Sequence, residues 1–442
     1  MLLIDLHQEI IDLVIDFLGL SGEPRDLCGL ALSCRTLHRS ARSAVPKFLS
    51  LYRPSVQFDL FQRTLDEDPT YGNGVRSLTL HRPNVVVEGG SHLTREQLEA
   101  FLLRFPDVRS LHLKEHYVPG SGDSILFQCR NHWKSLRELS LSDPKMTLSD
   151  LLEMIALPQL RYLNAAHLNF MDIPRDLNIP FRRSELRSLD LRSSRVEVEV
   201  LGIILQGIWS LRILRYKMPR RSGSMAMSSA AQLNIDYTIY KYRATSALLN
   251  SASTLTRLDF GIQSRRGRIV PDSEMIDLSR FIALKELRIC ALYFFTAIRG
   301  GVRAIPSTPS RNGLYRFLPP ALEALQIQFP SETGVFYRNP IRGSPERDRF
   351  VQNNMDEALY EWITEFAIHK SESLPSLRSI WMVESQHSPR MNMVFDLEAW
   401  DPPCHVKELF DEAGIDLNVH VRKPRTSTVN FKKIELPDIF ER

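Results

Sequence analysis

The chain has 442 residues, of which 43% are hydrophobic and 24% are charged, and its formal net charge is +4. This composition is typical of a globular protein with about two to four domains. The small net charge, together with the lack of any run of five like charges, excludes a dedicated nucleic-acid or membrane-surface patch.

The first ten residues, MLLIDLHQEI, carry no positively charged segment, so we do not expect a secretory signal. No stretch of about 18 apolar residues occurs, so no transmembrane helix is expected. The five cysteines are far apart and include no Cys-x-x-Cys pair. This usage indicates reduced thiols in a cytoplasmic or nuclear protein, and we expect neither a metal nor a cofactor.

Residues 6–18, LHQEIIDLVIDFL, predict a helix with an unusually wide apolar surface. At about 100° per residue, Gln8, Glu9, Asp12 and Asp16 fall in an arc roughly 100° wide, and apolar side chains fill an opposite arc of about 200°. One side of this arc carries Ile10, Leu13 and Phe17, and the other carries Ile11, Ile15 and Leu18. A helix docking on its own core needs only one side, so the second side predicts a partner. The sequence does not decide which side serves which purpose.

Further short helices are predicted after the turn SGEP at 21–24, where apolar residues recur every three or four positions from Leu27 to Val45. Residues 1–50 thus form one helical unit with a small core, which needs a neighbour or a partner for stability. Residues 51–74 are expected to be a linker.

From Val75 onward a phrase of the form Leu/Val-x-x-Leu-x-apolar repeats ten times. Several spacings between phrases, namely 28, 24, 26, 25 and 29 residues, fall in the window of about 20–29 residues that is typical of leucine-rich repeats. Helix-like segments that begin near Thr94 and Thr147 lie between phrases, and each Thr is placed to cap a helix N-terminus. The phrases are VRSLTL at 75, VRSLHL at 108, LRELSL at 136, LRYLNA at 160, LRSLDL at 186, LRILRY at 211, LTRLDF at 255, LKELRI at 284, LEALQI at 322 and LRSIWM at 377.

A strand, a turn and a helix in each unit predict an α/β fold, a solenoid with a parallel sheet inside and helices outside, over residues 75–400. An ordinary α/β domain with Leu-x-x-Leu strands is the alternative. Longer spacings mark insertions near 218–232, 299–313 and 337–349, which are rich in Gly, Pro, Ser and Arg and are expected to be exposed loops. A helix is expected over 356–369. Residues 401–442 are expected to form a C-terminal cap with a last strand, LNVHVRK, and a polar tail.

The N-terminal unit resembles the F-box, a helical module that binds the Skp adaptor of cullin-based ubiquitin ligases. The family's opening Leu-Pro-x-Glu-Ile is matched by residues 6–10, with His7 in the place of proline, and its later pattern by Asp26-Leu27, Leu30 and Cys34-Arg35. The match covers about a tenth of the chain. The resemblance implies that the adaptor-binding residues are Leu6, Ile10, Ile11, Val14, Ile15, Leu18, Leu27 and Leu30.

The repeats resemble those of fungal-type F-box proteins with leucine-rich repeats, in which they act as substrate receptors. The family's Asn after the strand is missing here, and the equivalent places hold Pro83, Pro144, Leu168 and Ser194. We therefore expect irregular turns that lack a side-chain ladder to backbone groups.

Strand alternation predicts which side chains could meet a substrate. If the leucines at places four and six of the phrase point into the core, places three, five and seven face the other way. A merely solvated sheet face is the alternative for any one of them. The arginines at place two, from Arg76 to Arg212, instead predict long stems packed along the sheet edge. The substrate-facing candidates are Tyr162, Asp190, Arg192, Arg215, Lys217, Arg257, Asp259, Arg288 and Trp381.

Motifs of catalysis are lacking in the sequence. Gly89-Gly90-Ser91 precedes no Gly-Lys-Ser/Thr arrangement, and there is neither a Gly-x-Ser-x-Gly elbow nor a His-Glu-x-x-His motif. We therefore expect no enzymatic activity. The resemblance to F-box proteins with leucine-rich repeats implies a substrate-recognition subunit of a cullin-type (SCF) ubiquitin ligase, which binds the Skp adaptor and a target protein, and we expect no nucleic acid and no membrane as partners. The alternatives are a stand-alone repeat scaffold whose N-terminal helices act only as a cap, and a regulator of a small GTPase.

Overall fold

The structure is a computed structural model. It describes residues 10–11, 13–14, 48–52, 56–81, 95–114, 132–142, 146–170, 183–218, 237–239, 241–262, 269–271, 275–295, 311–330, 334–336, 357–385, 387–388, 393–394 and 396–422. These residues form two compact units. The first unit is Met1–Val196 with Gly207–Leu211, and the second is Glu197–Gln206 with Arg212–Arg442.

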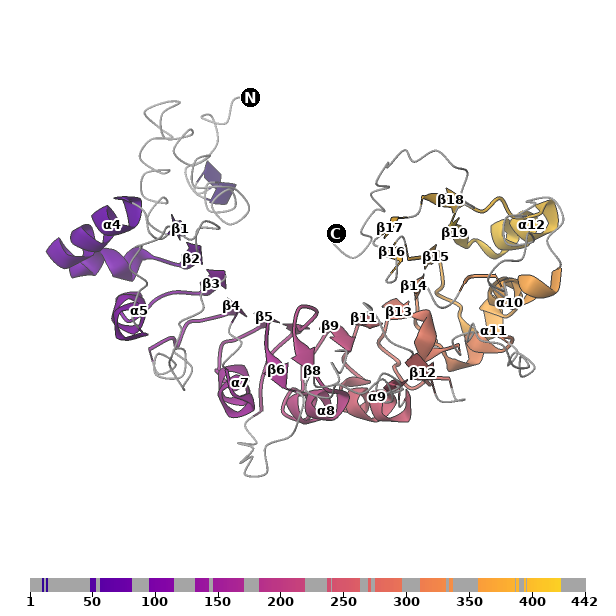
Figure 1. Cartoon of the computed structure of the whole chain (residues 1–442), viewed down its shortest axis with the longest axis horizontal. Helices are drawn as coiled ribbons and strands as arrows, with labels where there is room; N and C mark the ends of the chain where they lie inside the picture. The colour runs from indigo at the N-terminus through magenta and orange to yellow at the C-terminus, as the bar shows by residue number, and fades with distance from the viewer. Residues whose placement is uncertain are drawn as a thin grey trace, which may run out of the picture. The chain divides into compact units, whose positions relative to one another are not determined.

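The chain is a mixed α/β protein with a large, mainly parallel sheet of thirteen strands in the described residues (Figure 1). The first unit contributes six of them in the order β1-β2-β3-β4-β5-β7, and every neighbouring pair in this order is parallel. These strands are β1 (Phe48–Tyr52), β2 (Ser77–His81), β3 (Ser110–Lys114), β4 (Glu138–Ser142), β5 (Tyr162–Ala166) and β7 (Ser188–Asp190). The other elements of this unit are α4 (Val56–Glu67), η3 (Pro69–Gly74), α5 (Arg95–Leu102), α7 (Leu148–Ile155), β6 (Asn169–Phe170) and β8 (Arg195–Val196).

The second unit contributes seven strands in the order β9-β11-β13-β14-β15-β19-β18, and only the last pair is antiparallel. These strands are β9 (Ile213–Met218), β11 (Arg257–Ile262), β13 (Glu286–Cys290), β14 (Ala324–Phe329), β15 (Ser379–Glu384), β19 (Asp416–Arg422) and β18 (Leu397–Ala399). The helices are α8 (Val198–Gln206), α9 (Lys241–Leu248), η5 (Leu249–Ser251), η6 (Ala291–Tyr293), η7 (Leu314–Phe317), η9 (Glu357–Leu359), α10 (Glu361–Ile368), α11 (Lys370–Ser373) and α12 (Cys404–Ala413). Two small sheets, β10 (Tyr237–Ile239) with β12 (Ile269–Pro271) and β16 (His387–Ser388) with β17 (Met393–Val394), complete it.

Each of the ten repeated phrases contains one strand of the large sheet, and the phrases pair in register within each unit. Place four of one phrase lies opposite place four of the next, as in Leu78 with Leu111 and Leu258 with Leu287. These leucines are 0–1% exposed. The expectation of an α/β fold with a parallel sheet is confirmed, because the leucines of neighbouring phrases stack into one buried layer.

The start of each strand is fixed by a repeated pair of backbone hydrogen bonds. The carbonyl oxygen of Arg76, at place two, accepts from the amides of Arg109 (2.7 Å) and Ser110 (3.0 Å) in the next phrase. The carbonyl oxygen of Arg109 does the same for Arg137 and Glu138, at 2.7 and 2.9 Å. The same pattern continues in the second unit from Arg212 onward. Because the amides at places two and three of each phrase donate to the same carbonyl oxygen of the preceding phrase, all strands of the unit share one register.

Helix α7 begins as its sequence predicts. The Thr147 hydroxyl accepts a hydrogen bond from the Asp150 amide, and the Asp150 carboxylate accepts from the Thr147 amide at 3.0 Å. This reciprocal capping box satisfies two amides that the helix itself leaves without partners. Helix α5 starts at Arg95, one residue after the expected Thr94. In each unit, Figure 1 shows the helices on one side of the strands.

A serine supplies backbone contacts at a turn where the family's Asn is absent. Ser194 is fully buried, and its hydroxyl donates to the Ala165 carbonyl oxygen at 2.7 Å and accepts from the Leu168 amide at 3.2 Å. The expectation that this turn lacks a side-chain ladder is therefore wrong at Ser194. A hydroxyl can both donate and accept, so it satisfies two buried backbone groups of the preceding repeat.

Aromatic side chains make much of the core in the second unit. The rings of Tyr216 and Phe260 stack with centroids 5.2 Å apart, and Phe260 meets Tyr293 at 4.7 Å. Both tyrosines are 0% exposed. Burial raises the pKa of each phenol well above its ordinary value of 10.0. The Tyr293 hydroxyl has no hydrogen-bond partner within the described part of the chain.

A buried arginine joins this aromatic core. Arg311 is 3% exposed, and its guanidinium lies over the rings of Phe295, Trp362 and Phe329 at 4.6, 5.4 and 5.8 Å. It also donates to the Gly334 carbonyl oxygen at 2.9 Å. The insertion near 299–313 was expected to be an exposed loop. Only its end lies in the described residues, and there Arg311 is part of the core.

The predicted linker, the predicted helix near the C-terminus and the last predicted strand fall mainly in described residues. Residues 51–74, expected as a linker, contain the end of β1 together with α4 and η3. The helix expected over 356–369 corresponds to η9 and α10, and the last expected strand corresponds to β19. The insertion near 337–349 and almost all of that near 218–232 lie outside the described residues. None of the described helices has the length and apolarity that a membrane span requires.

Replacing Ser194 by Ala should lower the free energy of unfolding by about 1–3 kcal/mol, because two buried backbone groups lose their partner. The measurement is urea unfolding followed by circular dichroism. Ser193→Ala is the matched control, since Ser193 is exposed, and it should change stability by less than about 0.5 kcal/mol. Equal effects of the two changes would contradict this role of Ser194.

Tyr293→Phe should make the protein less sensitive to alkali. A phenol whose pKa is raised in the folded state releases its proton more readily when unfolded, so its stabilising effect is complete below pH 10 and is lost as pH rises above that value. Above pH 10, the free energy of unfolding of the variant should fall less steeply, by up to about 1.4 kcal/mol per pH unit. At pH 7 the variant should be at least as stable as the wild type. Urea titrations across this pH range test both statements, and identical slopes would contradict them.

Candidate functional site

The strands present one apolar face and one polar face in each unit. In β4 the side chains alternate, with Leu139 and Leu141 buried and Glu138, Ser140 and Ser142 half-buried. We call the set of side chains at places three, five and seven the polar face. Eight of the nine substrate-facing candidates lie at these places on strands, and Arg192 lies in the turn directly after β7.

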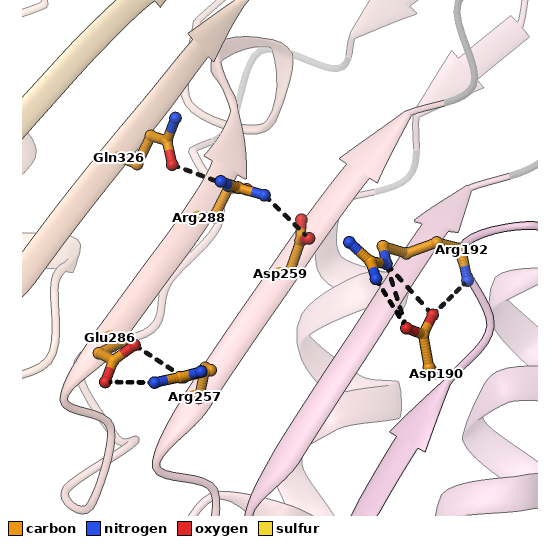
Figure 2. Close-up of polar contacts among 7 residues, drawn as sticks. All are labelled: Asp190, Arg192, Arg257, Asp259, Glu286, Arg288 and Gln326. Atoms are coloured by element: carbon orange, nitrogen blue, oxygen red, sulfur yellow. Dashed lines mark hydrogen bonds and ion pairs between the residues drawn. The ribbon is translucent and has the colours of Figure 1, made fainter. Parts of the chain in front are cut away.

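In the first unit, the candidates on this face are Tyr162, Asp190 and Arg192. Tyr162 is 49% exposed. The Asp190 carboxylate accepts from Arg192 Nε at 3.2 Å and from Nη2 at 2.9 Å, and it also accepts from the Arg192 backbone amide at 3.0 Å (Figure 2). Such a two-pronged pair fixes the guanidinium next to the end of β7.

In the second unit, place five holds a row of polar side chains across neighbouring strands. Strand register puts Arg215, Asp259, Arg288 and Gln326 opposite one another in that order. Arg288 Nε donates to Gln326 Oε1 at 2.7 Å, and Arg288 Nη1 lies 3.6 Å from Asp259 Oδ2 (Figure 2). Asp259 and Gln326 are only 3% and 5% exposed. A buried carboxylate is costly unless it is paired, so the row depends on its arginine.

A second arginine on the same face is held by two contacts. Arg257 Nη2 donates to Glu286 Oε1 at 2.8 Å, and Arg257 Nε lies 2.7 Å from Glu286 Oε2. These residues occupy place three of β11 and β13 and are in register. Arg257 is among the residues predicted from the sequence, whereas Glu286 is not. Its position at place three of the next phrase is the signal that could have identified it.

Lys217 and Trp381 complete the candidates of the second unit. A Cβ atom added to Gly261 would lie 3.1 Å from Lys217 Cγ and 3.6 Å from Cε, so the lysine stem lies across this glycine. Trp381 stacks on His420 with ring centroids 5.9 Å apart and planes 5° apart. Burial lowers the pKa of His420, which favours the neutral ring in this stack.

A serine, a histidine and a glutamate meet on the polar face of the first unit. Ser110 Oγ lies 2.8 Å from His112 Nε2 and donates to Glu138 Oε2 at 3.1 Å. The carboxylate lies 3.8 Å from the same ring nitrogen. In a catalytic triad the carboxylate holds the other nitrogen, so that Nε2 can take the serine proton. This cluster does not have that arrangement.

Two of the place-two arginines pair with the acid that precedes the next phrase. Arg76 Nη1 lies 2.9 Å from Asp107 Oδ2 and donates to the Asp107 carbonyl oxygen at 3.1 Å. Arg161 pairs with Glu185 in the same way. These arginines link consecutive repeats at the start of their strands, outside the polar face.

The first predicted helix is described at four residues, all of them helical. Ile10 and Leu13 are 46% and 69% exposed, whereas Ile11 is 2% exposed and Val14 is half-buried. The side of the wide apolar arc that carries Ile10 and Leu13 is therefore exposed. The other expected adaptor-binding residues, Leu6, Ile15, Leu18, Leu27 and Leu30, lie outside the described residues.

The described residues contain no group of three or more His, Cys, Asp or Glu side chains that could hold a metal ion. Their two cysteines carry free thiols, buried at Cys290 and exposed at Cys404. No protein-family model and no curated protein matches the chain.

Asp259→Leu should lower the free energy of unfolding by about 3 kcal/mol, because the mostly buried Arg288 guanidinium loses this carboxylate. Adding Arg288→Met should restore at least half of the loss, since an apolar pair needs no charge compensation. Urea unfolding of the single and double variants measures the coupling.

Glu323→Leu is the control for this experiment. Glu323, directly before β14, pairs at 2.8 Å with Lys285, directly before β13, but the two side chains are 36% and 57% exposed. Solvent screening limits the loss there to under about 1 kcal/mol. Similar losses for Asp259→Leu and Glu323→Leu would contradict the burial argument.

Proposed function

We propose that this protein is a substrate-recognition subunit of a cullin-type ubiquitin ligase, which binds the Skp adaptor through an N-terminal F-box and a target protein through leucine-rich repeats. The observation that carries the proposal is the exposure of Ile10 and Leu13 on one turn of the first helix. Ile11 on the same turn is buried, so the helix has an internal face and a separate apolar face for a partner. Burial of a large apolar side chain is worth roughly 1.5–3 kcal/mol.

The repeats support the second half of the proposal. Ten phrases give ten strands, and in each unit their leucines share a layer while charged and aromatic side chains share the other face. We take this as an irregular leucine-rich-repeat solenoid. Repeat proteins use such extended faces to bind other proteins, and Arg, Trp and Tyr, which recur among the candidates, are the residues enriched at binding hot spots.

The proposed mechanism requires no chemistry from this chain. The adaptor end holds the protein on the ligase, and the polar face holds the target near the ubiquitin carrier. Tethering raises the effective concentration of the target lysines, which increases the transfer rate without a catalytic group from the receptor. A cytoplasmic or nuclear location is part of the proposal, because the ligase works there.

Two other functions remain as alternatives. In the first, residues 1–50 only cap a stand-alone repeat scaffold, and solenoids need such caps. It predicts that deleting residues 1–47, which leaves β1 in place, lowers the melting temperature and that no adaptor binds. In the second, the repeats regulate a small GTPase, which a nucleotide-hydrolysis assay with and without the protein would reveal.

Ile10→Asp combined with Leu13→Asp should abolish co-elution of the full chain with the Skp adaptor in size-exclusion chromatography. Two buried carboxylates would replace two apolar contacts in the interface, which is enough to remove micromolar binding. The melting temperature of the variant should stay near that of the wild type, because both side chains are exposed.

The matched control is Leu60→Asp combined with Ile368→Asp. These residues are 54% and 56% exposed and lie on α4 and α10, so the control introduces the same charges elsewhere. It should co-elute like the wild type. The F-box proposal fails if wild-type protein does not co-elute, or if both double variants behave alike.

A further inference from the structure

We propose that the polar face of the second unit binds a carboxylate-rich, acidic segment of the protein partner. This inference rests on the proposed function and names its substrate class. On strands β9, β11, β13, β14 and β15, this face carries four cations and two anions, an excess of two positive charges by subtraction. The cations are Arg215, Lys217, Arg257 and Arg288, and the anions are Asp259 and Glu286. Asp416, on β19, lies outside this group.

The charges are spread over the sheet and do not converge on one point. Arg215 and Lys217 lie on β9, Arg257 on β11 and Arg288 on β13. Neighbouring strands are about 4.8 Å apart, and alternate residues of a strand are roughly 6.6 Å apart. The cations are thus distributed at spacings that suit several singly charged side chains of a partner.

This distribution favours carboxylates over phosphate. A phosphate group is compact and doubly charged, and it is bound tightly where several donors converge on it. Here Arg257 and Arg288 are each already held by a carboxylate of the same sheet. A run of Asp or Glu side chains can instead interact with the excess charge at several positions at once, without displacing Glu286 from Arg257.

Two of the arginines are held in place before a partner arrives. Glu286 holds Arg257 by two contacts, and Gln326 and Asp259 hold Arg288 from either side (Figure 2). Their side chains are 17% and 12% exposed. A side chain that is already ordered loses little rotamer entropy on binding, which is the main cost of engaging a long cation.

Lys217 is the cation most available to a partner. It makes no ion pair with any described residue, and its stem lies across Gly261, where an added Cβ would lie 3.1 Å from Lys217 Cγ and force the stem to shift by a few tenths of an ångström. Because Gly261, at place seven of β11, has no side chain, the Lys217 stem can lie along the sheet there. At the other end of the place-five row, Trp381 lies in register with Gln326 and provides an apolar contact. The preferred segment thus combines acidic residues with one large apolar residue.

The test is fluorescence anisotropy of the full chain with a labelled oligo-glutamate peptide that contains one leucine. It should bind, and more weakly as salt increases, because charges near a surface are screened. Lys217→Glu should weaken peptide binding, with a dissociation constant roughly tenfold higher. Lys217→Gln, which avoids a new charge, should weaken it less, and Gly261→Ala should weaken it without any change of charge.

Arg280→Glu is the matched control, because Arg280 is exposed in the turn before β13 and lies outside the polar face. It should bind the peptide like the wild type. Equal losses for Arg280→Glu and Lys217→Glu would show only a general effect of net charge and would overturn the proposal. So would tighter binding of a phosphoserine peptide of equal charge, or binding of an oligo-lysine peptide.

Adaptor co-elution separates this inference from the proposed function. Lys217→Glu should co-elute with the Skp adaptor as the wild type does, since it lies far along the sequence from the first helix. Co-elution without peptide binding would overturn the acidic-segment inference alone. Peptide binding without co-elution would overturn the ligase proposal and leave an acidic-peptide-binding scaffold.

Discussion

The register of the parallel ladder is the constraint on which the rest of this structure depends. In each unit, the carbonyl oxygen at place two of one phrase accepts hydrogen bonds from the amides at places two and three of the next. Side chains alternate along a strand, so a slip of one residue would move every leucine of a phrase from the core to the polar face. No single phrase can bury its leucines alone. Backbone pairing and apolar burial therefore stabilise the same register together.

This register also decides which polar side chains can meet. Since equal places lie opposite one another, Arg257 meets Glu286 at place three, and Asp259 meets Arg288 at place five. These two charge pairs thus run across neighbouring strands, between residues 29 positions apart in the chain. Contacts of this kind order the face as a whole, because each guanidinium is fixed by a neighbouring strand.

Much of this arrangement can be predicted from the sequence, and each feature that cannot be predicted has a physical reason. The phrase locates ten strands and their buried leucines, because a period of two within a period of about 25 is hard to produce otherwise. β1 was missed, since FLSLY precedes the first phrase and lacks its leading leucine. The ladder role of Ser194 cannot be predicted from the sequence, because its two partners, Ala165 and Leu168, belong to the preceding repeat. The exposed side of the first helix was undecided, as both sides of its arc are equally apolar.

The buried row formed by Asp259, Arg288 and Gln326 raises a question that stability alone does not answer. Replacing a buried ion pair by well-packed apolar residues is often neutral or stabilising by about 1–4 kcal/mol. The opposite face of the same strands shows that this chain can fill such positions with leucine and isoleucine. A paired row costs stability that an apolar row would not, yet it keeps cations ordered on a face that would otherwise be apolar and prone to association. On the proposal that this face binds an acidic partner, the row holds Arg288 in a fixed position between Gln326 and Asp259, which an apolar row could not do.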